Sequence, residues 1–214
     1  MTNRPVALVT GATRGIGRAI AVELSSTHRI LVGGRDAARA GELVAELDDA
    51  APFVCDLADE DAVAAACAGI GRLDVLVHSA GIGRSNDIGL ASRALWREVF
   101  ETNVFAVADL TRLLLPALEA ARGIVVAINS GAGFFSSPGG GVYAGSKFAL
   151  RALTDALREE MRGKVRVCSI HPGRTDTDMQ RELQAAMGNE HYNGSCYVSP
   201  GSVAAAVRLA VDTP

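Results

Sequence analysis

The chain has 214 residues, a net charge of −3 and an apolar share of 49%, which fits one α/β domain with a full core and no strong field to attract nucleic acid or a membrane surface. No uninterrupted apolar run approaches the roughly 18 residues that a membrane span needs. The N-terminus does not read as a secretory signal, so we expect a cytoplasmic protein.

Short apolar runs alternate with longer segments of helical periodicity along the chain. Strands that are apolar on both faces are typical of a parallel sheet covered by helices on both sides, and repeated βα units predict a doubly wound Rossmann-type sheet. No repeat or linker divides the chain, so we predict one domain over 1–214, with a substrate loop at about 174–200 inside an irregular stretch from 172 to 200. The predicted strands are 6–9, 30–32, 52–55, 73–77, 124–128 and 165–170. The first predicted helix follows the turn after strand 6–9 and ends at about residue 25. The other predicted helices span 36–47, 59–68, 92–120, 142–161 and 202–211.

A glycine-rich turn, TGATRGIG at residues 10–17, joins the first strand to the first helix. Gly11 permits a tight turn, Gly15 lets the backbone approach a pyrophosphate, and Gly17 lets helix and strand pack closely. The start of the helix offers N–H groups and a positive dipole end to the phosphates. Because the turn follows a strand and opens a helix, a dinucleotide site is favoured over a glycine-rich turn that binds nothing.

The end of the second strand predicts NADP(H) rather than NAD(H) as the cofactor. Gly34 stands where an NAD site would have a carboxylate for the ribose 2′-OH, and the guanidinium of Arg35 could grip a 2′-phosphate. Arg14 could be a second cation. The alternative for Arg35 is a solvated charge at a helix start, and Asp36 is expected to be the helix N-cap.

Four polar side chains are candidate catalytic residues. Tyr143 and Lys147 are four residues apart and share one helix face, so the ammonium could lower the pKa of the phenol toward the range useful for proton transfer. Ser130 follows the fifth strand, at the sheet edge where such folds form sites. Asn103 lies in a long helix, where an amide is unfavourable. The alternatives are a surface Tyr/Lys pair, a turn serine and an exposed helix asparagine.

Taken together, these motifs resemble the short-chain dehydrogenase/reductase family over essentially the whole chain. The resemblance implies an oxidoreductase that interconverts a small-molecule carbonyl and alcohol by hydride transfer. A non-catalytic nucleotide sensor or scaffold on the same fold is the alternative, while an epimerase or dehydratase would need a larger substrate domain. The resemblance rests on TGATRGIG at 10–17, Asp56-Leu57, HSAG at 78–81, Asn103, Ser130, YAGSK at 143–147, Pro172-Gly173 and Thr177.

The resemblance also implies a role for each of these residues. Tyr143 would be the general acid/base, and Ser130 would orient the carbonyl. Lys147 would hold the nicotinamide ribose and lower the tyrosine pKa, and Asn103 would support a water that relays protons through Lys147. The predicted cofactor contacts, from the residues and the resemblance together, are Gly11, Thr13, Arg14, Gly15, Ile16, Gly17, Arg35, Asp56, Leu57, Ala80, Gly81, Asn103, Tyr143, Lys147, Pro172, Gly173 and Thr177.

Two features depart from the family pattern. His78 stands where the family usually has an asparagine that braces the sheet, and we expect it to be a structural histidine. The family's seventh strand is apparently missing, so six strands are expected. Something else should then cover the edge of strand 165–170: further residues, the 174–200 segment or a partner chain.

The remaining expectations concern assembly and metals. The resemblance points to helices 92–120 and 142–161 as a two-fold interface, which predicts a homodimer or homotetramer. The four cysteines are scattered, and the histidines have no metal-ligand spacing with them or with each other. We therefore predict free thiols and no metal site.

Overall fold

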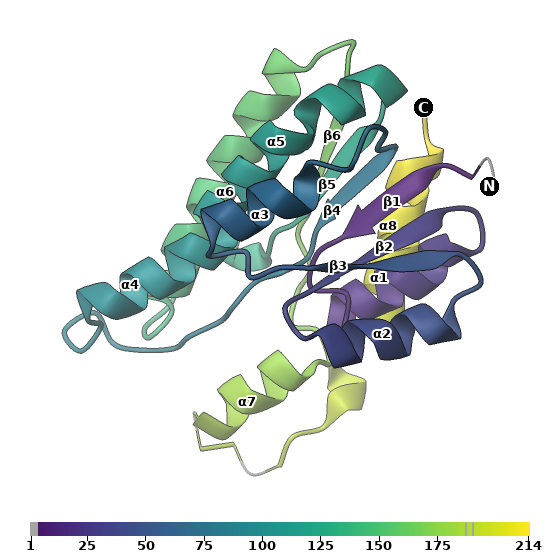
Figure 1. Cartoon of the computed structure of the whole chain (residues 1–214). Helices are drawn as coiled ribbons and strands as arrows, with labels where there is room; N and C mark the ends of the chain where they lie inside the picture. The colour runs from purple at the N-terminus through teal and green to yellow at the C-terminus, as the bar shows by residue number, and fades with distance from the viewer. Residues whose placement is uncertain (1–3, 187, 190) are drawn as a thin grey trace.

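The computed structural model describes residues 4–186, 188–189 and 191–214, and its centre is a six-stranded parallel sheet (Figure 1). Across the sheet the order is β3-β2-β1-β4-β5-β6, which confirms the doubly wound Rossmann-type prediction. The order changes direction between β1 and β4, which leaves a crevice at their carboxyl ends. The strands are β1 (Val6–Val9), β2 (Arg29–Gly34), β3 (Ala50–Val54), β4 (Val75–His78), β5 (Ile124–Ile128) and β6 (Arg166–Ile170).

Helices cover both faces of this sheet (Figure 1). Val9 and Val77 point into the cluster beneath α1, α2 and α8, while Leu8 and Leu76 point into the cluster beneath α3, α5 and α6. Because all four side chains are fully buried, the strands are apolar on both faces. One face carries α1 (Gly15–Ser25), α2 (Ala37–Glu46) and α8 (Pro200–Asp212), and the other carries α3 (Glu60–Cys67), α5 (Ala106–Ala121) and α6 (Gly141–Glu160).

The helix predicted over 92–120 is divided by a π-helical segment. α4 (Arg93–Phe100) is followed by the π segment Glu101–Phe105 and then by α5. Ser92 caps the start, because its side-chain oxygen accepts the N–H of Leu95 at 3.2 Å. A π segment turns the residues inside it away from the positions of a regular α-helix. Asn103 is the middle residue of this segment.

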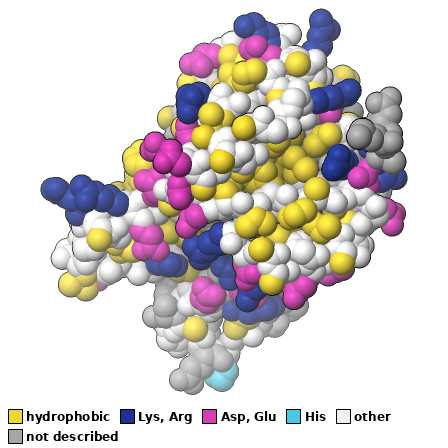
Figure 2. All heavy atoms as spheres, viewed as in Figure 1, with side chains coloured by type: hydrophobic (Ala, Val, Ile, Leu, Met, Phe, Trp, Pro, Cys, Tyr) yellow, Lys and Arg dark blue, Asp and Glu magenta, His cyan; other side chains and the backbone are white. Residues whose placement is uncertain are grey.

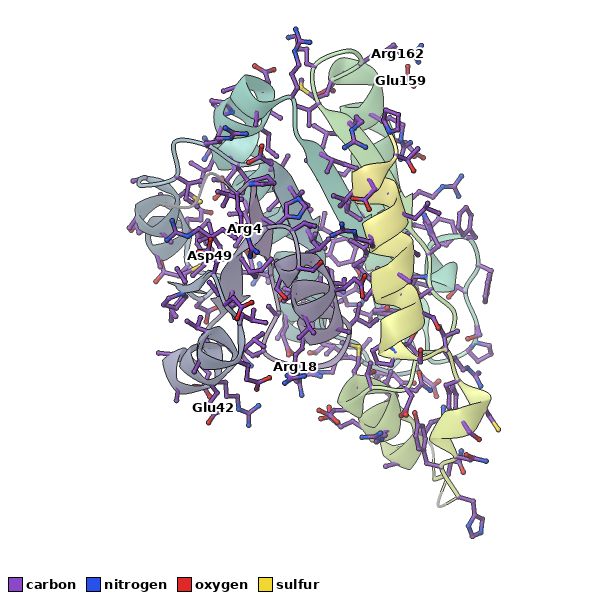
Figure 3. The ribbon with its side chains drawn as sticks, turned by 90° about the vertical axis from the view of Figure 1, so that its right-hand side faces the viewer. Arg4, Arg18, Glu42, Asp49, Glu159 and Arg162 are labelled. Carbon is purple, nitrogen blue, oxygen red and sulfur yellow. The ribbon has the colours of Figure 1, made fainter. Side chains whose placement is uncertain are left out.

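The stretch from 172 to 200, predicted to be irregular, contains α7 (Asp178–Ala186) and a 3₁₀ turn (Gly194–Cys196). That prediction was wrong because α7 is polar: Met179 and Leu183 are its only large apolar residues, too few to show a helical period. Figure 3 shows α7 at the opposite end of the molecule from the labelled Glu159 and Arg162 at the end of α6.

β6 is the outer strand on one side of the sheet. Arg158 of α6 donates its Nε–H to the main-chain carbonyl of Val167 at 3.0 Å. In the described ranges no seventh strand pairs with β6, and the 174–200 segment forms no ladder with it. Within the described residues the 174–200 segment therefore forms no strand against this edge, and the side chain of Arg158, which was not among the expected covers, bonds to it.

Candidate active site

A cleft of about 460 Å³ lies at the carboxyl ends of β1 and β4, in the crevice where the strand order changes direction. The turn after β1, the tips of β2, β3 and β4 and the start of α7 form its walls. It therefore brings together most of the predicted cofactor residues. Those that line it are Gly11, Thr13, Arg14, Gly15, Ile16, Gly17, Arg35, Asp56, Leu57, Ala80, Gly81 and Thr177.

The glycine turn has the close packing expected of a phosphate cradle. Gly11 and Gly15 have φ angles of 63° and 55°. A Cβ on Gly17 would lie 2.2 Å from the Gly11 carbonyl oxygen, and one on Gly11 would lie 2.8 Å from the Ala80 Cα. Among the described residues no side chain caps the start of α1, and its first turn has no acidic residue. The N–H groups of this helix end therefore remain free for an anion, and the cradle fits a pyrophosphate.

The tip of β2 gathers basic side chains at one end of the cleft. Arg35 is exposed, and its guanidinium has no ion-pair partner within the described part of the chain. Asp36 accepts two main-chain N–H groups at 3.0 and 3.2 Å, which confirms it as the N-cap, and it pairs with Arg39 at 3.5 Å. A Cβ on Gly34 would lie 2.7 Å from Thr13 Cγ2. A carboxylate side chain at position 34 would therefore need Thr13 to move.

Several lining residues were missed from the sequence. Thr10 accepts the N–H groups of Ser79 and Ala80 at 3.0 and 3.1 Å, and so ties the tip of β1 to the loop after β4. Arg39 follows Arg35 by one helical turn, a spacing that could have revealed it. Thr10, Gly34 and Asp36 stand in the sequence motifs described above, but they were not predicted to contact the cofactor. The lining residues outside the predicted set are Thr10, Gly33, Gly34, Asp36, Arg39, Phe53, Cys55, Ser79, Ile82, Thr102, Asp178 and Met179.

α7 contacts the rest of the molecule above the glycine turn. Glu182 of α7 lies 3.8 Å from Arg14, and both side chains are exposed. A Cβ on Gly83, in the loop after β4, would lie 3.2 Å from the Met179 sulfur and 3.3 Å from a methyl group of Leu183. The polar helix therefore rests on the cleft through its two large apolar residues.

Tyr143 and Lys147 lie one turn apart on α6, as their spacing predicts. Lys147 is buried, donates from Nζ to the carbonyl of Ile128 at 3.0 Å, and has its Nζ 5.8 Å from the centroid of the Tyr143 ring. Burial lowers the pKa of Lys147 to about 8. Burial also raises the pKa of Tyr143, while a side-chain hydrogen bond with Ser130 lowers it. Lys147 is not among the causes that shift the pKa of Tyr143, so the expected lowering by Lys147 stays a prediction.

Asn103 joins the π segment to the rest of the site. It is 1% exposed, so the alternative of an exposed helix asparagine is wrong. Its Oδ1 accepts the N–H of Ile82 at 2.9 Å, and its Nδ2 donates to the Ile82 carbonyl and to Ser146 Oγ, each at 3.0 Å. A Cβ on Gly81 would lie 3.2 Å from Asn103 Oδ1 and 3.9 Å from Lys147 Nζ. Asn103 and Lys147 therefore flank the same glycine of the cofactor cleft.

Ser130 follows β5 and begins a short 3₁₀ turn, Gly131–Gly133. Its Oγ accepts the N–H of Ala132 at 3.1 Å, which leaves the hydroxyl proton free for another acceptor. Gly131 donates its N–H to the carbonyl of Pro172 at 3.1 Å, so this predicted residue lies beside the turn of Ser130. Gly173 is exposed and, like Pro172, does not line the cleft.

His78 connects the sheet to α5. It is 3% exposed, and its Nε2 lies 2.8 Å from Thr111 Oγ1, which in turn donates to the Val107 carbonyl at 2.7 Å. The hydroxyl proton is used in that second bond, so His78 is the donor of the first. Burial lowers the pKa of His78 to about 4. A neutral histidine that bonds β4 to α5 matches the structural role expected for it.

Comparison with known proteins decides which family shares this arrangement. The family model described as short chain dehydrogenase matches residues 5–188. The chain belongs to the short-chain dehydrogenase family. A serine 3-dehydrogenase from Agrobacterium fabrum is 36% identical over 199 residues, which cover 89% of this chain and 79% of that protein. The 3-oxoacyl-[acyl-carrier-protein] reductase FabG from Pseudomonas aeruginosa is 35% identical, over 85% of this chain and 78% of its own.

Solved structures resemble this short-chain dehydrogenase over nearly its whole length. An alcohol dehydrogenase from the archaeon Thermococcus sibiricus, complexed with 5-hydroxy-NADP, matches 99% of this chain and 92% of its own with a TM-score of 0.89 and 27% identity. A serine dehydrogenase in its closed form, complexed with NADP⁺, matches 98% of this chain and 90% of its own, with a TM-score of 0.88 and 28% identity. The short-chain dehydrogenase described here is therefore an oxidoreductase with a Rossmann nucleotide-binding fold.

The described residues contain no helix that is both long and apolar enough to cross a membrane. They also contain no cluster of three or more His, Cys, Asp or Glu side chains that could hold a metal ion.

Proposed function

We propose that this short-chain dehydrogenase is NADP(H)-dependent and interconverts a carbonyl and an alcohol by hydride transfer, with Tyr143 as the general acid/base. The observation that carries the proposal is the convergence of the site. Ser130 lies close enough to Tyr143 to lower the pKa of its phenol. Lys147 and Asn103 flank Gly81, which lines the cleft. A non-catalytic sensor would need the cleft but not this convergence.

The residues of the cleft fit a nicotinamide dinucleotide, which supplies the hydride when it is bound. The glycine turn and the start of α1 would hold the pyrophosphate, and Asp56 and Leu57 would meet the adenine. A 2′-phosphate would fit at the tip of β2, where Gly34 brings no carboxylate and Arg35, Arg39 and Arg14 provide positive charge. The NADP⁺ and 5-hydroxy-NADP bound in the two solved relatives support this choice over NAD(H).

The proton chemistry follows from the hydroxyl groups of the site. Ser130 Oγ already accepts the N–H of Ala132, so its hydroxyl proton would be donated to the substrate oxygen. Burial raises the pKa of Tyr143, which keeps the phenol protonated at neutral pH. It can therefore give a proton to a carbonyl oxygen during reduction and take one back during oxidation.

Lys147 and Asn103 would support the proton transfer. The pKa of Lys147 lies at about 8, close enough to neutral pH for this buried amine to return a proton while it holds the nicotinamide ribose. The amide of Asn103 fixes the loop at Ile82 against Ser146 of α6. The proton-relaying water that the family resemblance implies at Asn103 remains a proposal.

The test is a panel of carbonyls with NADPH and of alcohols with NADP⁺, followed by absorbance of the nicotinamide. Serine belongs among the alcohols and 3-oxoacyl compounds belong among the carbonyls, because two relatives are named for them. Turnover of any member supports the proposed enzyme. Tight NADPH binding without turnover of any member would support the sensor instead, and failure to bind NADPH would contradict both.

Two further proposals concern the setting in which the enzyme works. We propose the cytoplasm, in keeping with four cysteines that are all free thiols, as a reducing compartment favours. We also propose a homodimer or homotetramer, in keeping with the exposed aromatic side chains Phe105 and Phe148.

A further inference from the structure

The turn that carries Ser130 is bonded to the segment after β6, across the end of the sheet. Asn129 donates its N–H to the carbonyl of Ile170 at 2.8 Å, and Gly131 donates to the carbonyl of Pro172 at 3.1 Å. Between these two bonds a regular parallel ladder would take an N–H from residue 172. Pro172 has no N–H to give. The ladder is therefore interrupted directly beside Ser130.

The side chain of His171 lies at this interruption. Its Nδ1 is 3.0 Å from the main-chain carbonyl oxygen of Ser130. A carbonyl can only accept, so Nδ1 carries the hydrogen, and the neutral ring is the Nδ1–H tautomer. The same carbonyl accepts the N–H of Gly133 at 2.9 Å. The peptide group of Ser130 is thus held from two sides, by its own turn and by the segment after β6.

The imidazole ring is also in contact with an aromatic side chain. The ring centroids of His171 and Phe134 are 4.4 Å apart, with the two planes tilted by 45°. The guanidinium carbon of Arg151 lies 4.4 Å from the Phe134 centroid, so Phe134 contacts both a cation and a second ring. The contact with Phe134 favours the ring orientation in which His171 Nδ1–H points at the Ser130 carbonyl.

We propose that His171 is a positioning residue for Ser130. Its Nδ1–H holds the main chain of Ser130 so that the Ser130 hydroxyl keeps its direction toward the substrate oxygen. That direction depends on the turn, because Ser130 Oγ accepts the N–H of Ala132 inside it. The inference rests on the proposed function, since it requires Ser130 to act on a substrate.

Two substitutions separate the hydrogen bond from His171 to Ser130 from the contact between the His171 ring and Phe134. His171→Phe keeps an aromatic ring against Phe134 and removes the donor, whereas His171→Asn keeps an N–H donor near the position of Nδ1 and removes the ring. We expect kcat to fall about tenfold in His171→Phe, the effect of one lost hydrogen bond of ordinary strength, with the Kd of NADPH unchanged. His171→Asn should recover most of the loss. A native kcat in the Phe variant, or equal losses in both variants, would overturn the proposal.

A double-mutant cycle tests whether His171 acts through Ser130. In a Ser130→Ala background, the group that His171 positions is gone, so adding His171→Phe should lower the residual kcat no further. A second, independent tenfold loss in that background would show that His171 acts elsewhere. The thermal unfolding midpoints of the single variants show whether a loss of activity reflects a loss of fold.

The tautomer of His171 can be read without any turnover. Nitrogen NMR of the imidazole ring in the native protein should show Nδ1 protonated and Nε2 bare. An Nε2–H tautomer would overturn the positioning role even in an active enzyme. If no member of the carbonyl and alcohol panel is turned over, the proposed function fails and the positioning role with it, whatever the tautomer. The two failures are therefore distinguishable.

Discussion

Tyr143 is the residue on which the proposed chemistry depends. In Tyr143→Phe the ring stays and the proton is lost, so turnover should fall about a thousandfold, within the usual contribution of a general acid/base. The Kd of NADPH should stay within a few-fold of the native value. Tyr197→Phe is the matched control, because Tyr197 stacks on Tyr192 in the segment after β6 and has no role in proton transfer. Native turnover in Tyr143→Phe would remove the phenol from the mechanism.

Arg35 is the residue expected to choose between the two nicotinamide cofactors. It lines the cleft beside Gly34, which brings no carboxylate to this position. Arg35→Ala should weaken NADPH about tenfold or more while NADH binding changes little, because one charged hydrogen bond to the 2′-phosphate is lost. Titration of both cofactors measures this, with Arg162→Ala, at the far end of α6 (Figure 3), as the control. Equal native affinities for NADPH and NADH would contradict the assignment.

The spacing of single residues predicted which side chains meet but not how they are bonded. Tyr143 and Lys147 share a helix face whatever surrounds them, so their proximity could be read from the sequence. The bond from Lys147 to Ile128 and the bonds from Asn103 to Ile82 join residues that the fold brings together. These bonds decide the direction of the amine and the burial of the amide. No local pattern contains them.

At the scale of elements, the bond from His78 to Thr111 connects β4 with α5 and predicts a pH dependence of stability. The folded-state pKa of His78 is lowered to about 4, below its ordinary value of about 6.5. Between these values the unfolded chain binds more protons than the folded one, so the free energy of unfolding falls as the pH falls. His78 should account for about 2 kcal/mol of loss between pH 7 and pH 5.

The measurement is urea unfolding of the native protein and of His78→Asn at pH 7, 6 and 5. The variant should lose less stability over this range, whatever its stability at pH 7. His191→Asn, which replaces an exposed histidine, serves as the control and should follow the native slope. Burial also lowers the pKa of His28, so part of the slope remains in every variant. Identical slopes in native protein and His78→Asn would refute the argument.

The bounds of elements with a strong apolar period were predicted to within a few residues. α7 and the π segment, which have no apolar period of their own, were missed. The strand at 124–128 matches β5, and the helix at 36–47 matches α2 with Asp36 as its cap. α7 was missed because its stability does not come from a buried apolar stripe. The π segment was missed because one extra residue per turn changes neither the composition nor the apolar period of a long helix.

At the scale of the whole molecule, exposed aromatic side chains on the π segment and α6 favour self-association. Phe105 is 53% exposed and Phe148 is 44% exposed, and their burial against a second copy of the chain would remove apolar surface from water. We expect light scattering to give a dimer or tetramer at micromolar concentration. Phe105→Asp should shift the mass toward monomer, whereas Val22→Asp, at an exposed apolar site on α1, should not. A native protein of monomer mass would contradict the prediction.

The order of the sheet was within reach of the sequence because it follows from repeated right-handed βα units. The surface charge could also be anticipated. On the face drawn in Figure 2, acidic and basic side chains are interspersed, as a net charge of −3 suggests. What covers the outer edge of β6 was not predictable, because it depends on a single arginine whose stem happens to reach Val167.

The two ends of the segment between Thr175 and Val198 lie side by side. A parallel bridge closes it there, with Asp176 N–H bonded to the Val198 carbonyl at 2.9 Å. Inside it, the Asp176 carboxylate accepts bonds from Arg181 and from the Tyr192 hydroxyl, each at 2.9 Å, so these contacts are satisfied within the segment itself.

We expect much of a segment closed in this way to be exchangeable between relatives. Its middle can change in length and sequence without altering the register of any strand, because both of its ends are fixed by the same bridge. Its first residues are constrained, because Thr177, Asp178 and Met179 line the cleft and Glu182 and Leu183 contact Arg14 and the loop after β4. Chimeras that exchange residues 184–197 between relatives keep those contacts and therefore offer a direct route to new substrate ranges.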